Sequence, residues 1–377
     1  MRLGIVAVCF ALLTGAALAQ EESPAALAKG AVAQFNMAHS ELEAAQSAGD
    51  RVKALTRVVR AYEDGLEAMR AGLRQVSLRE GELAREFQDE SGQVAQLLGI
   101  LINLKPDASP EALVHPTGPL GHARAGMLVS AITPAMQADA DALRIKLEEV
   151  SILRELQDEA LETLARGLKE AQQARTDLSQ AMSDRTDLPR RFSADPDRLK
   201  TLIDSSETLE AFASGLAVMD VVDGISPLPD LDAAKGTWPM PVSGVFIRGY
   251  KEPDAAGVAR PGWLWATRAL SLVSTPWPAT IRYKGAFLDY GNVIILEPGN
   301  DVLLVLAGLD EVYGEVGEVI PAGTAVGLMG GAAPDLDAFV ENATQGTGAG
   351  LSETLYIEVR EGGKPVNPEQ WFANAPL

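Results

Sequence analysis

The chain of 377 residues has only one cysteine, Cys9, and three histidines, His39, His115 and His122. Cys9 lies in a segment that we expect to be removed, so no thiol remains for a disulfide, a zinc knuckle or nucleophilic catalysis. Beyond residue 122 the chain has no imidazole. Basic residues are also scarce, because 32 lysines and arginines stand against 52 acidic residues, a formal net charge of −20. This charge repels nucleic acid and anionic lipid, so it favours a protein partner and no nucleic acid.

Long apolar runs are missing as well. Residues 1–19 combine a positive start at Arg2, an apolar run over residues 5–13 and small residues before Gln20. This pattern predicts a cleaved signal peptide over residues 1–19 and a periplasmic protein. The other interpretation, a membrane anchor, needs about 20 apolar residues, roughly twice the length of this run.

The composition changes near residue 235. All five tryptophans follow that point, whereas the preceding part is rich in Ala, Leu, Glu, Arg and Gln. Helix formers in the first part and strand and turn residues in the second predict an α + β multidomain chain. We expect a helical coiled coil over residues 20–190, an amphipathic helix over 195–222, a linker over 223–235 and a mainly antiparallel β domain over 236–377.

Two apolar stripes with steps of three and four residues run over 55–101 and 136–182. Such stripes are typical of a heptad seam. A stretch with proline and glycine separates them, which predicts a long antiparallel coiled-coil hairpin with its tip near 101–133. Pairing between two chains would bury the stripes equally well. Apolar residues at the tip favour either a docking surface or a closed hairpin end.

The segment 195–222 begins with Asp195, Pro196 and Asp197, a signal for a helix start. Its apolar residues fall on one face of the expected helix, and they are Leu199, Leu202, Ile203, Leu209, Phe212 and Leu216. A lone helix with such a face needs a groove to cover.

Short alternating runs separated by glycines extend from residue 245 to residue 359 and predict β-strands. Within them five motifs follow in order, which are DYGNVIILEPG (289–299), VLAGL (305–309), VGEVIPAG (316–323), LYIEVR (355–360) and PVNP (365–368). Together they resemble the LytM (lysostaphin-type) zinc endopeptidase domain.

In that family two histidines and an aspartate bind zinc, and two further histidines assist catalysis. The resemblance places other residues at these five positions, which are Arg260, Leu264, Gly308, Thr354 and Tyr356. A catalytic zinc site usually needs three protein ligands, and this segment offers no imidazole or thiolate. We therefore expect a degenerate domain with no catalytic residue, no metal and no cofactor.

The order of coiled coil, short helix and degenerate LytM domain resembles the EnvC family of murein hydrolase activators. The resemblance implies a non-catalytic activator of N-acetylmuramoyl-L-alanine amidases in septal peptidoglycan splitting, at the division septum. It also implies that the coiled-coil tip docks on the extracytoplasmic domain of the FtsEX complex, and that the 195–222 helix inhibits by covering the LytM groove.

The aromatic and arginine content near the degenerate positions favours a binding groove for the amidase. We expect this groove to consist of Trp263, Leu264, Trp265, Tyr356 and Arg360. Strand residues such as Tyr356 can also be core. Two other functions stay open, a scaffold that binds peptidoglycan through the degenerate cleft and an active peptidase.

Overall fold

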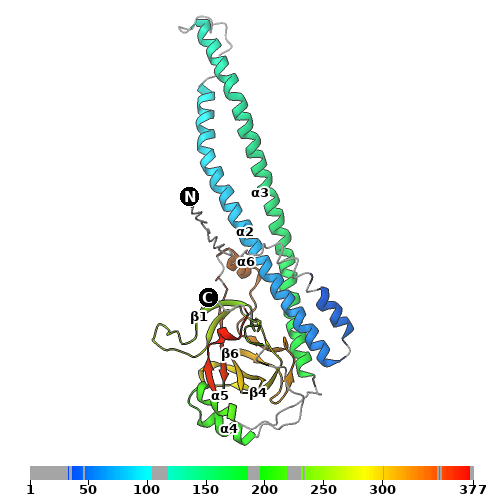
Figure 1. The fold of residues 1–377 in the computed structure, drawn as a ribbon. Coiled ribbons are helices and arrows are strands. Elements are labelled where there is room, and N and C mark those ends of the chain that lie inside the picture. The colour runs from blue at the N-terminus through cyan, green and yellow to red at the C-terminus, as the bar shows by residue number, and fades with distance from the viewer. Residues whose placement is uncertain are drawn as a thin grey trace, which may run out of the picture.

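The structure is a computed structural model. It describes residues 36–45, 47–103, 118–185, 196–218, 234–299, 301–345 and 350–373, together with residues 33, 231 and 348. Two long helices project from a β domain, and short helices lie against that domain (Figure 1). The predicted α + β class is confirmed. The expected signal peptide lies outside the described residues, as does almost all of the expected 223–235 linker.

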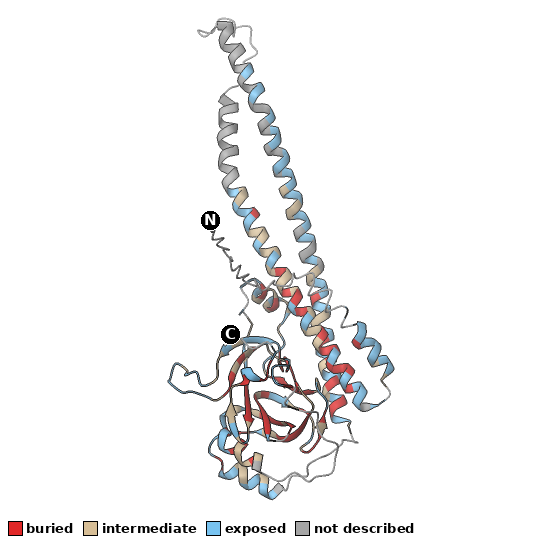
Figure 2. Ribbon diagram, viewed as in Figure 1, coloured by how far each residue is buried: buried red, intermediate tan, exposed pale blue. Residues whose placement is uncertain are grey.

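The long helices are α2 (Ala48–Asn103) and α3 (Gly118–Ser183). Near the β domain they bury a common core that includes Leu66, Leu73 and Leu164. Figure 2 shows that exposure increases away from the β domain, and there Leu147 of the expected seam is 55% exposed. Residues 104–117 of the expected tip lie outside the described residues. A coiled coil over the full length stays a prediction.

Ion pairs join the outer parts of these two helices. Arg79 of α2 contacts Glu149 of α3 at 2.7 Å, and Lys146 of α3 contacts Glu86 at 3.2 Å. These side chains are partly or largely exposed, and such pairs contribute about 1 kcal/mol or less. Apolar packing therefore holds the inner parts of the two helices together, and these ion pairs add weaker polar contacts on either side of the buried Leu83.

The described strands form one 10-stranded sheet, in which every strand pairing is antiparallel and the order along its main path is β1-β2-β9-β6-β5-β4-β7. The mainly antiparallel prediction is confirmed. The strands are β1 (Gly244–Arg248), β2 (Trp263–Thr267), β3 (Leu272–Ser274), β4 (Ala279–Ala286), β5 (Asn292–Gly299), β6 (Val302–Val312), β7 (Val319–Ile320), β8 (Ala325–Met329), β9 (Glu353–Glu361) and β10 (Lys364–Val366).

Both faces of the central strands are buried. In β5, Val293 and Ile295 belong to one core, whereas Ile294 and Leu296 belong to another. Successive side chains of a strand point to opposite faces, so a continuous apolar run such as this one needs cover on both sides. Tryptophans pack on one face, and two short helices cover the other.

The expected single helix over 195–222 is two helices, α4 (Pro196–Ser205) and α5 (Leu209–Val218). The side chain of Ser206 donates a hydrogen bond to the Leu202 carbonyl at 2.6 Å, and the Thr208 hydroxyl accepts one from the Ala211 amide at 3.1 Å. Hydroxyl side chains compete with the helix backbone and favour caps. Thr208 therefore starts a new helix where the apolar period alone predicted continuity.

Replacing Thr208 by alanine is expected to destabilise α5 by about 1 kcal/mol, since the first-turn amide of Ala211 loses its acceptor. Hydrogen exchange over residues 209–218 would measure this loss. Replacing the exposed Thr201, whose hydroxyl donates to the Asp197 carbonyl within α4, is the control. Equal exchange in both variants would show that the cap does not hold α5.

The inner ends of α2 and α3 pack on the β domain. Glu63 of α2 accepts hydrogen bonds from the Leu272 amide at 2.9 Å and from Arg175 of α3 at 3.2 Å. Ser179 of α3 lies 2.7 Å from the Tyr313 hydroxyl. These contacts tie three elements distant in sequence into one unit. Neither long helix, nor any other helix within the described ranges, is apolar over enough residues to cross a membrane.

A helix that the sequence analysis did not predict, α6 (Leu336–Gln345), completes this junction. Asp335 accepts a hydrogen bond from the Ala338 amide at 2.8 Å and so caps the helix. Phe339 of α6 is buried with Leu66 and Leu164 of the long helices. An aspartate before a run with an apolar residue every three to four positions was the signal that could have revealed α6.

Candidate functional site

The five positions at which the LytM family carries its zinc site lie close together. Leu264 of β2 pairs with Tyr356 of β9, and Thr354 precedes Tyr356 on the same side of that strand. Gly308 of β6 lies beside Thr354, because a Cβ atom at Gly308 would come within 2.5 Å of the Thr354 carbonyl oxygen. Gly308 also has φ of +95°. The backbone alone therefore explains why residue 308 is a glycine, since β6 and β9 approach too closely there for a side chain.

Arg260 joins this group through an aromatic contact. Its guanidinium lies 5.4 Å from the centre of the Tyr290 ring, and the Tyr290 and Tyr356 rings lie 5.8 Å apart. Residues from the 249–262 loop, β2, β6 and β9 thus meet around two tyrosines. The structure brings all five positions together, while their descent from a zinc site stays a prediction.

Tyr356 belongs to a buried polar group with Glu358 and Arg360. The Tyr356 hydroxyl donates a hydrogen bond to Glu358 at 2.6 Å, and Arg360 forms an ion pair with the same carboxylate. Burial, with the Glu358 carboxylate beside it, raises the pKa of Tyr356 well above its ordinary value. Burial also raises the pKa of Glu358, against the opposing effects of Tyr356 and Arg360. Tyr356 consequently stays protonated and acts as a hydrogen-bond donor.

Arg360 also fixes α5 to the sheet. Its Nη2 donates to the Ser214 hydroxyl of α5 at 2.6 Å and to the Gly363 carbonyl at 2.6 Å. The side chain is 1% exposed. The structure therefore places Arg360, which we expected to line a binding groove, beneath α5 rather than at the surface.

A second buried arginine, Arg282 of β4, holds the other end of α5. It donates to the Leu216 carbonyl at 2.9 Å and pairs with Glu297 at 2.9 Å. A cation at the last turn of a helix satisfies a carbonyl that has no partner within the helix. Arg282 was not among the predicted site residues, although an arginine within an apolar strand is a visible signal.

The expected inhibitory helix covers the sheet face that carries Tyr356. Phe212 of α5 stacks on Phe287 and meets Tyr283 edge-on, with ring centres 4.7 Å apart in both pairs. Leu209, Phe212 and Leu216 are buried in one core with Tyr356, and Leu264 packs against that core. Of the residues expected on the apolar face of α4, Leu199, Leu202 and Ile203 are partly buried against the same core.

The expectation that Trp263 and Trp265 line a groove with Leu264 and Tyr356 is wrong. Both tryptophans are buried, at 3% and 8% exposure, in the core on the opposite face of the sheet. Trp263 packs against Phe372, with ring centres 5.5 Å apart. Alternate residues of β2 point to opposite faces, so Leu264 cannot share a face with its two neighbours.

Metal binding depends on clustered ligands. Among the described residues, no three His, Cys, Asp or Glu side chains are grouped so that they could hold a metal ion. Around the five positions the polar groups are instead the Tyr356 hydroxyl, the Glu358 carboxylate and the Arg260 and Arg360 guanidiniums. Of these groups, the Tyr356 hydroxyl and the Arg360 guanidinium are buried and already hydrogen-bonded within the domain.

No family model matches the chain. A curated relative, an uncharacterized protein of Neisseria meningitidis serogroup B, is 26% identical over 151 residues, which are 40% of this chain and 22% of the relative. The match thus spans about a fifth of that relative's length. The activity and partners of the whole protein are therefore matters for proposal.

Several solved structures are similar to part of the chain. Helicobacter pylori Csd3 is 19% identical with a TM-score of 0.28, covering 37% of this chain and 35% of Csd3. A putative peptidase M23 from Pseudomonas aeruginosa is 17% identical with a TM-score of 0.31, covering 48% of this chain and 64% of that one. The catalytic domain of EnpA from Enterococcus faecalis is 17% identical with a TM-score of 0.28, covering 37% and 98%.

Proposed function

We propose that the protein is a non-catalytic regulator of peptidoglycan cleavage in the periplasm. In this proposal its β domain binds an N-acetylmuramoyl-L-alanine amidase and relieves that enzyme's inhibition during septal splitting. The motifs that resemble the LytM domain, together with the different residues at all five zinc-site positions, support it. The tip of the long helices would dock on the extracytoplasmic domain of FtsEX.

The observation that carries the proposal is the cover that α5 provides. The face beneath it includes the aromatic residues Tyr283, Phe287 and Tyr356. If α5 left the sheet, these rings would form an exposed apolar patch next to Arg260, and patches of this kind mark protein interaction sites. A helix with one apolar face could then take the place of α5.

The polar contacts between α5 and the sheet are of a kind that allows the helix to leave the sheet and return. Its two arginine partners, Arg282 and Arg360, belong to the sheet and keep their partners Glu297 and Glu358 when α5 is absent. The sheet therefore retains satisfied ion pairs in both states. Release of α5 would break the hydrogen bonds Arg282–Leu216, Arg360–Ser214 and Ser214–Gly363, and water can replace the lost partner on each side.

The test is a dye-release assay on labelled cell walls with a purified amidase and the full chain. We expect release to increase with both proteins present and to stay at background with this protein alone. Arg260→Glu is expected to weaken stimulation at least about fivefold, because it reverses the charge at the edge of the proposed binding face, and interface arginines often contribute more than 1 kcal/mol.

Lys251→Glu is the matched control. It makes the same charge change on the same loop, but Lys251 lies over Tyr250 rather than over Tyr290. Equal stimulation by both variants would contradict binding at the Arg260 edge. If the protein binds purified sacculi but never alters amidase activity, the scaffold function replaces this proposal.

A further inference from the structure

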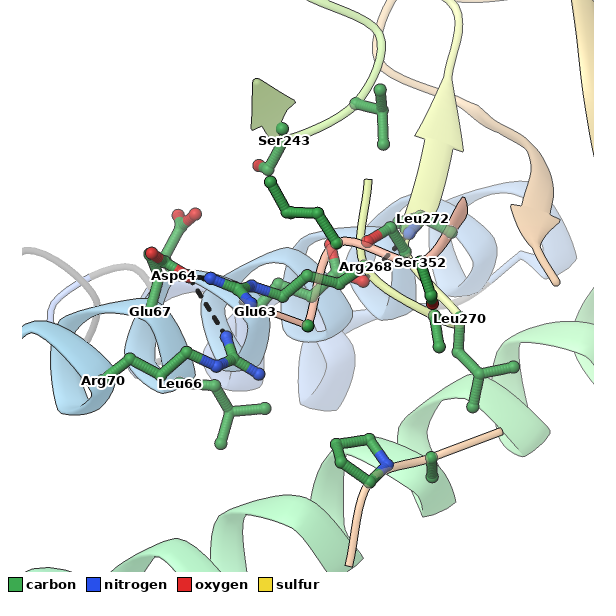
Figure 3. A pocket seen from close by; sticks show the side chains of 18 of the residues that line it. Glu63, Asp64, Leu66, Glu67, Arg70, Ser243, Arg268, Leu270, Leu272 and Ser352 are labelled. Carbon is green, nitrogen blue, oxygen red and sulfur yellow. Dashed lines mark hydrogen bonds and ion pairs between the residues drawn. The ribbon is translucent and has the colours of Figure 1, made fainter. Parts of the chain in front are cut away.

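A large cavity lies on the other side of the β domain from α5, where α2, α3, α6 and the start of β1 meet. Its volume is about 810 Å³. Figure 3 shows charged side chains of α2 on one side of it and Arg268 reaching in from the end of β2. Its apolar lining includes Leu66, Leu168, Leu272 and Phe339. A space of this size can hold a few amino-acid residues or a small ligand.

The charged lining of the cavity is positive overall. Four arginines contribute to it, and three carboxylates oppose them, namely Glu63, Asp64 and Glu67. This excess is opposite in sign to the net charge of the chain, which is −20. An anion is therefore the ligand charge that the cavity favours.

The arginines are held in place before any ligand arrives. Arg70 and Arg268 both contact the Glu67 carboxylate, at 3.1 and 2.9 Å (Figure 3). The Arg70 guanidinium also lies 4.1 Å above the ring centre of Phe339. Burial, together with the nearby Arg268 guanidinium, lowers the pKa of Arg70 to about 10. Two guanidiniums that share one carboxylate carry an excess of positive charge, so a second anion beside that carboxylate would stabilise both.

The Glu63 carboxylate does not compete with an incoming anion for Arg70 and Arg268. It is already bound by the Leu272 amide and by Arg175, deep between α2, α3 and β3. Arg60 donates to the Ser274 hydroxyl, so it too has a structural contact. Arg70 and Arg268 are therefore the pair best placed to meet an incoming anion.

An exposed strand edge begins at the same cavity. Ser243, Gly244 and Val245 line it, and β1 continues away from it to Arg248. Among the described strands, β1 pairs only with β2 and forms the end of the sheet. Val245 and Ile247 of β1 are 49% and 47% exposed. An exposed edge with apolar side chains can accept an extended peptide as a further strand.

The direction of a strand added to β1 connects the exposed strand edge with the arginine-lined cavity. Every strand pairing in the sheet is antiparallel, and a strand added to β1 in the same sense would run opposite to it. Its C-terminal end would then lie beside Gly244, at the cavity that Arg70 and Arg268 line. We propose that β1 and this cavity together bind the C-terminal segment of an extended peptide, whose backbone pairs with β1 and whose terminal carboxylate contacts Arg70 and Arg268 beside Glu67.

This site is separate from the face under α5, and it is tested by peptide binding without an amidase. The probe is the dye-labelled peptide Lys-Val-Thr-Val-Ala with a free carboxylate, titrated with the full chain and followed by fluorescence anisotropy. The same peptide ending in an amide should bind about tenfold more weakly or worse, because it loses the charge-assisted hydrogen bonds. A peptide N-methylated at two successive amides should also bind at least about tenfold more weakly, because one of those amides must face β1.

A matched pair of variants locates the site. Arg268→Gln should remove the difference between the acid and amide peptides. Arg74→Gln should preserve it, because Arg74 donates to the Ala343 carbonyl outside the cavity lining. No binding of the acid peptide at millimolar concentration, or equal binding of the acid, amide and N-methylated peptides, would overturn the proposal. The peptide comparisons use the unaltered protein, so they decide the matter even if Arg268→Gln fails to fold.

Discussion

Replacing Phe212 by alanine is expected to detach α5 from the sheet while the β domain stays folded. Phe212 is fully buried between Phe287 and Tyr283, and truncating such a residue costs about 3–5 kcal/mol. Each 1.4 kcal/mol or so changes an equilibrium tenfold. The uncovered state should therefore become about a hundredfold more populated or more. Hydrogen exchange over residues 209–218 should accelerate, and amidase stimulation in the dye-release assay should increase.

Glu210→Gln is the control for this experiment. Glu210 lies on the exposed side of the same helix, and a surface substitution usually changes stability by about 0.5 kcal/mol or less. Faster exchange in the Phe212 variant without a change in stimulation would mean that α5 covers the sheet but does not inhibit. Unchanged exchange would mean that the aromatic contact does not hold α5.

Replacing Arg360 by methionine is expected to destabilise the β domain itself. Arg360 and Glu358 are 1% and 2% exposed, so the substitution leaves a buried carboxylate without its cation. Breaking a buried pair in this way costs about 3–5 kcal/mol. The denaturant midpoint of unfolding should fall accordingly. The Ser214 contact of α5 is lost as well.

A double variant separates the ion pair from simple loss of packing. Glu358→Gln together with Arg360→Met should recover part of the lost stability, because no buried charge then lacks a partner. The Lys284–Glu315 pair, at 30% and 54% exposure, is the surface comparison, and Lys284→Met should cost about 1 kcal/mol or less. If the double variant is as unstable as Arg360→Met, the carboxylate is not the cause.

These two variants act on α5 from different sides. Phe212 supplies the apolar contact of the helix, and Arg360 supplies a polar contact from the sheet. Only the Phe212 change leaves the buried polar group of Tyr356, Glu358 and Arg360 intact. It is therefore the cleaner test of regulation, whereas the Arg360 change tests the stability of the site.

Part of the neighbourhood around Tyr356 could be anticipated from the sequence. The resemblance to the LytM domain implied that Leu264, Gly308, Thr354 and Tyr356 share one neighbourhood, and in the structure the cross-strand pairs bring them together. The apolar residues of α5 were also identified, since their spacing is local. The roles of other residues could not be predicted, because they depend on contacts with residues far away in the sequence. Arg282 is one, because its role appears only when Leu216, 66 positions away, lies above it.

The sequence by itself determined the class of the chain, its two long helical stripes and the absence of histidine beyond residue 122, because composition and periodicity are local properties. Only the tertiary structure decided which face of β2 each side chain occupies, and so placed Trp263 in a core and Leu264 beneath the short helices. It also brought Phe339 under Arg70 and built the arginine-lined cavity. The reason is that strand order and packing join residues hundreds of positions apart, and no local pattern encodes those contacts.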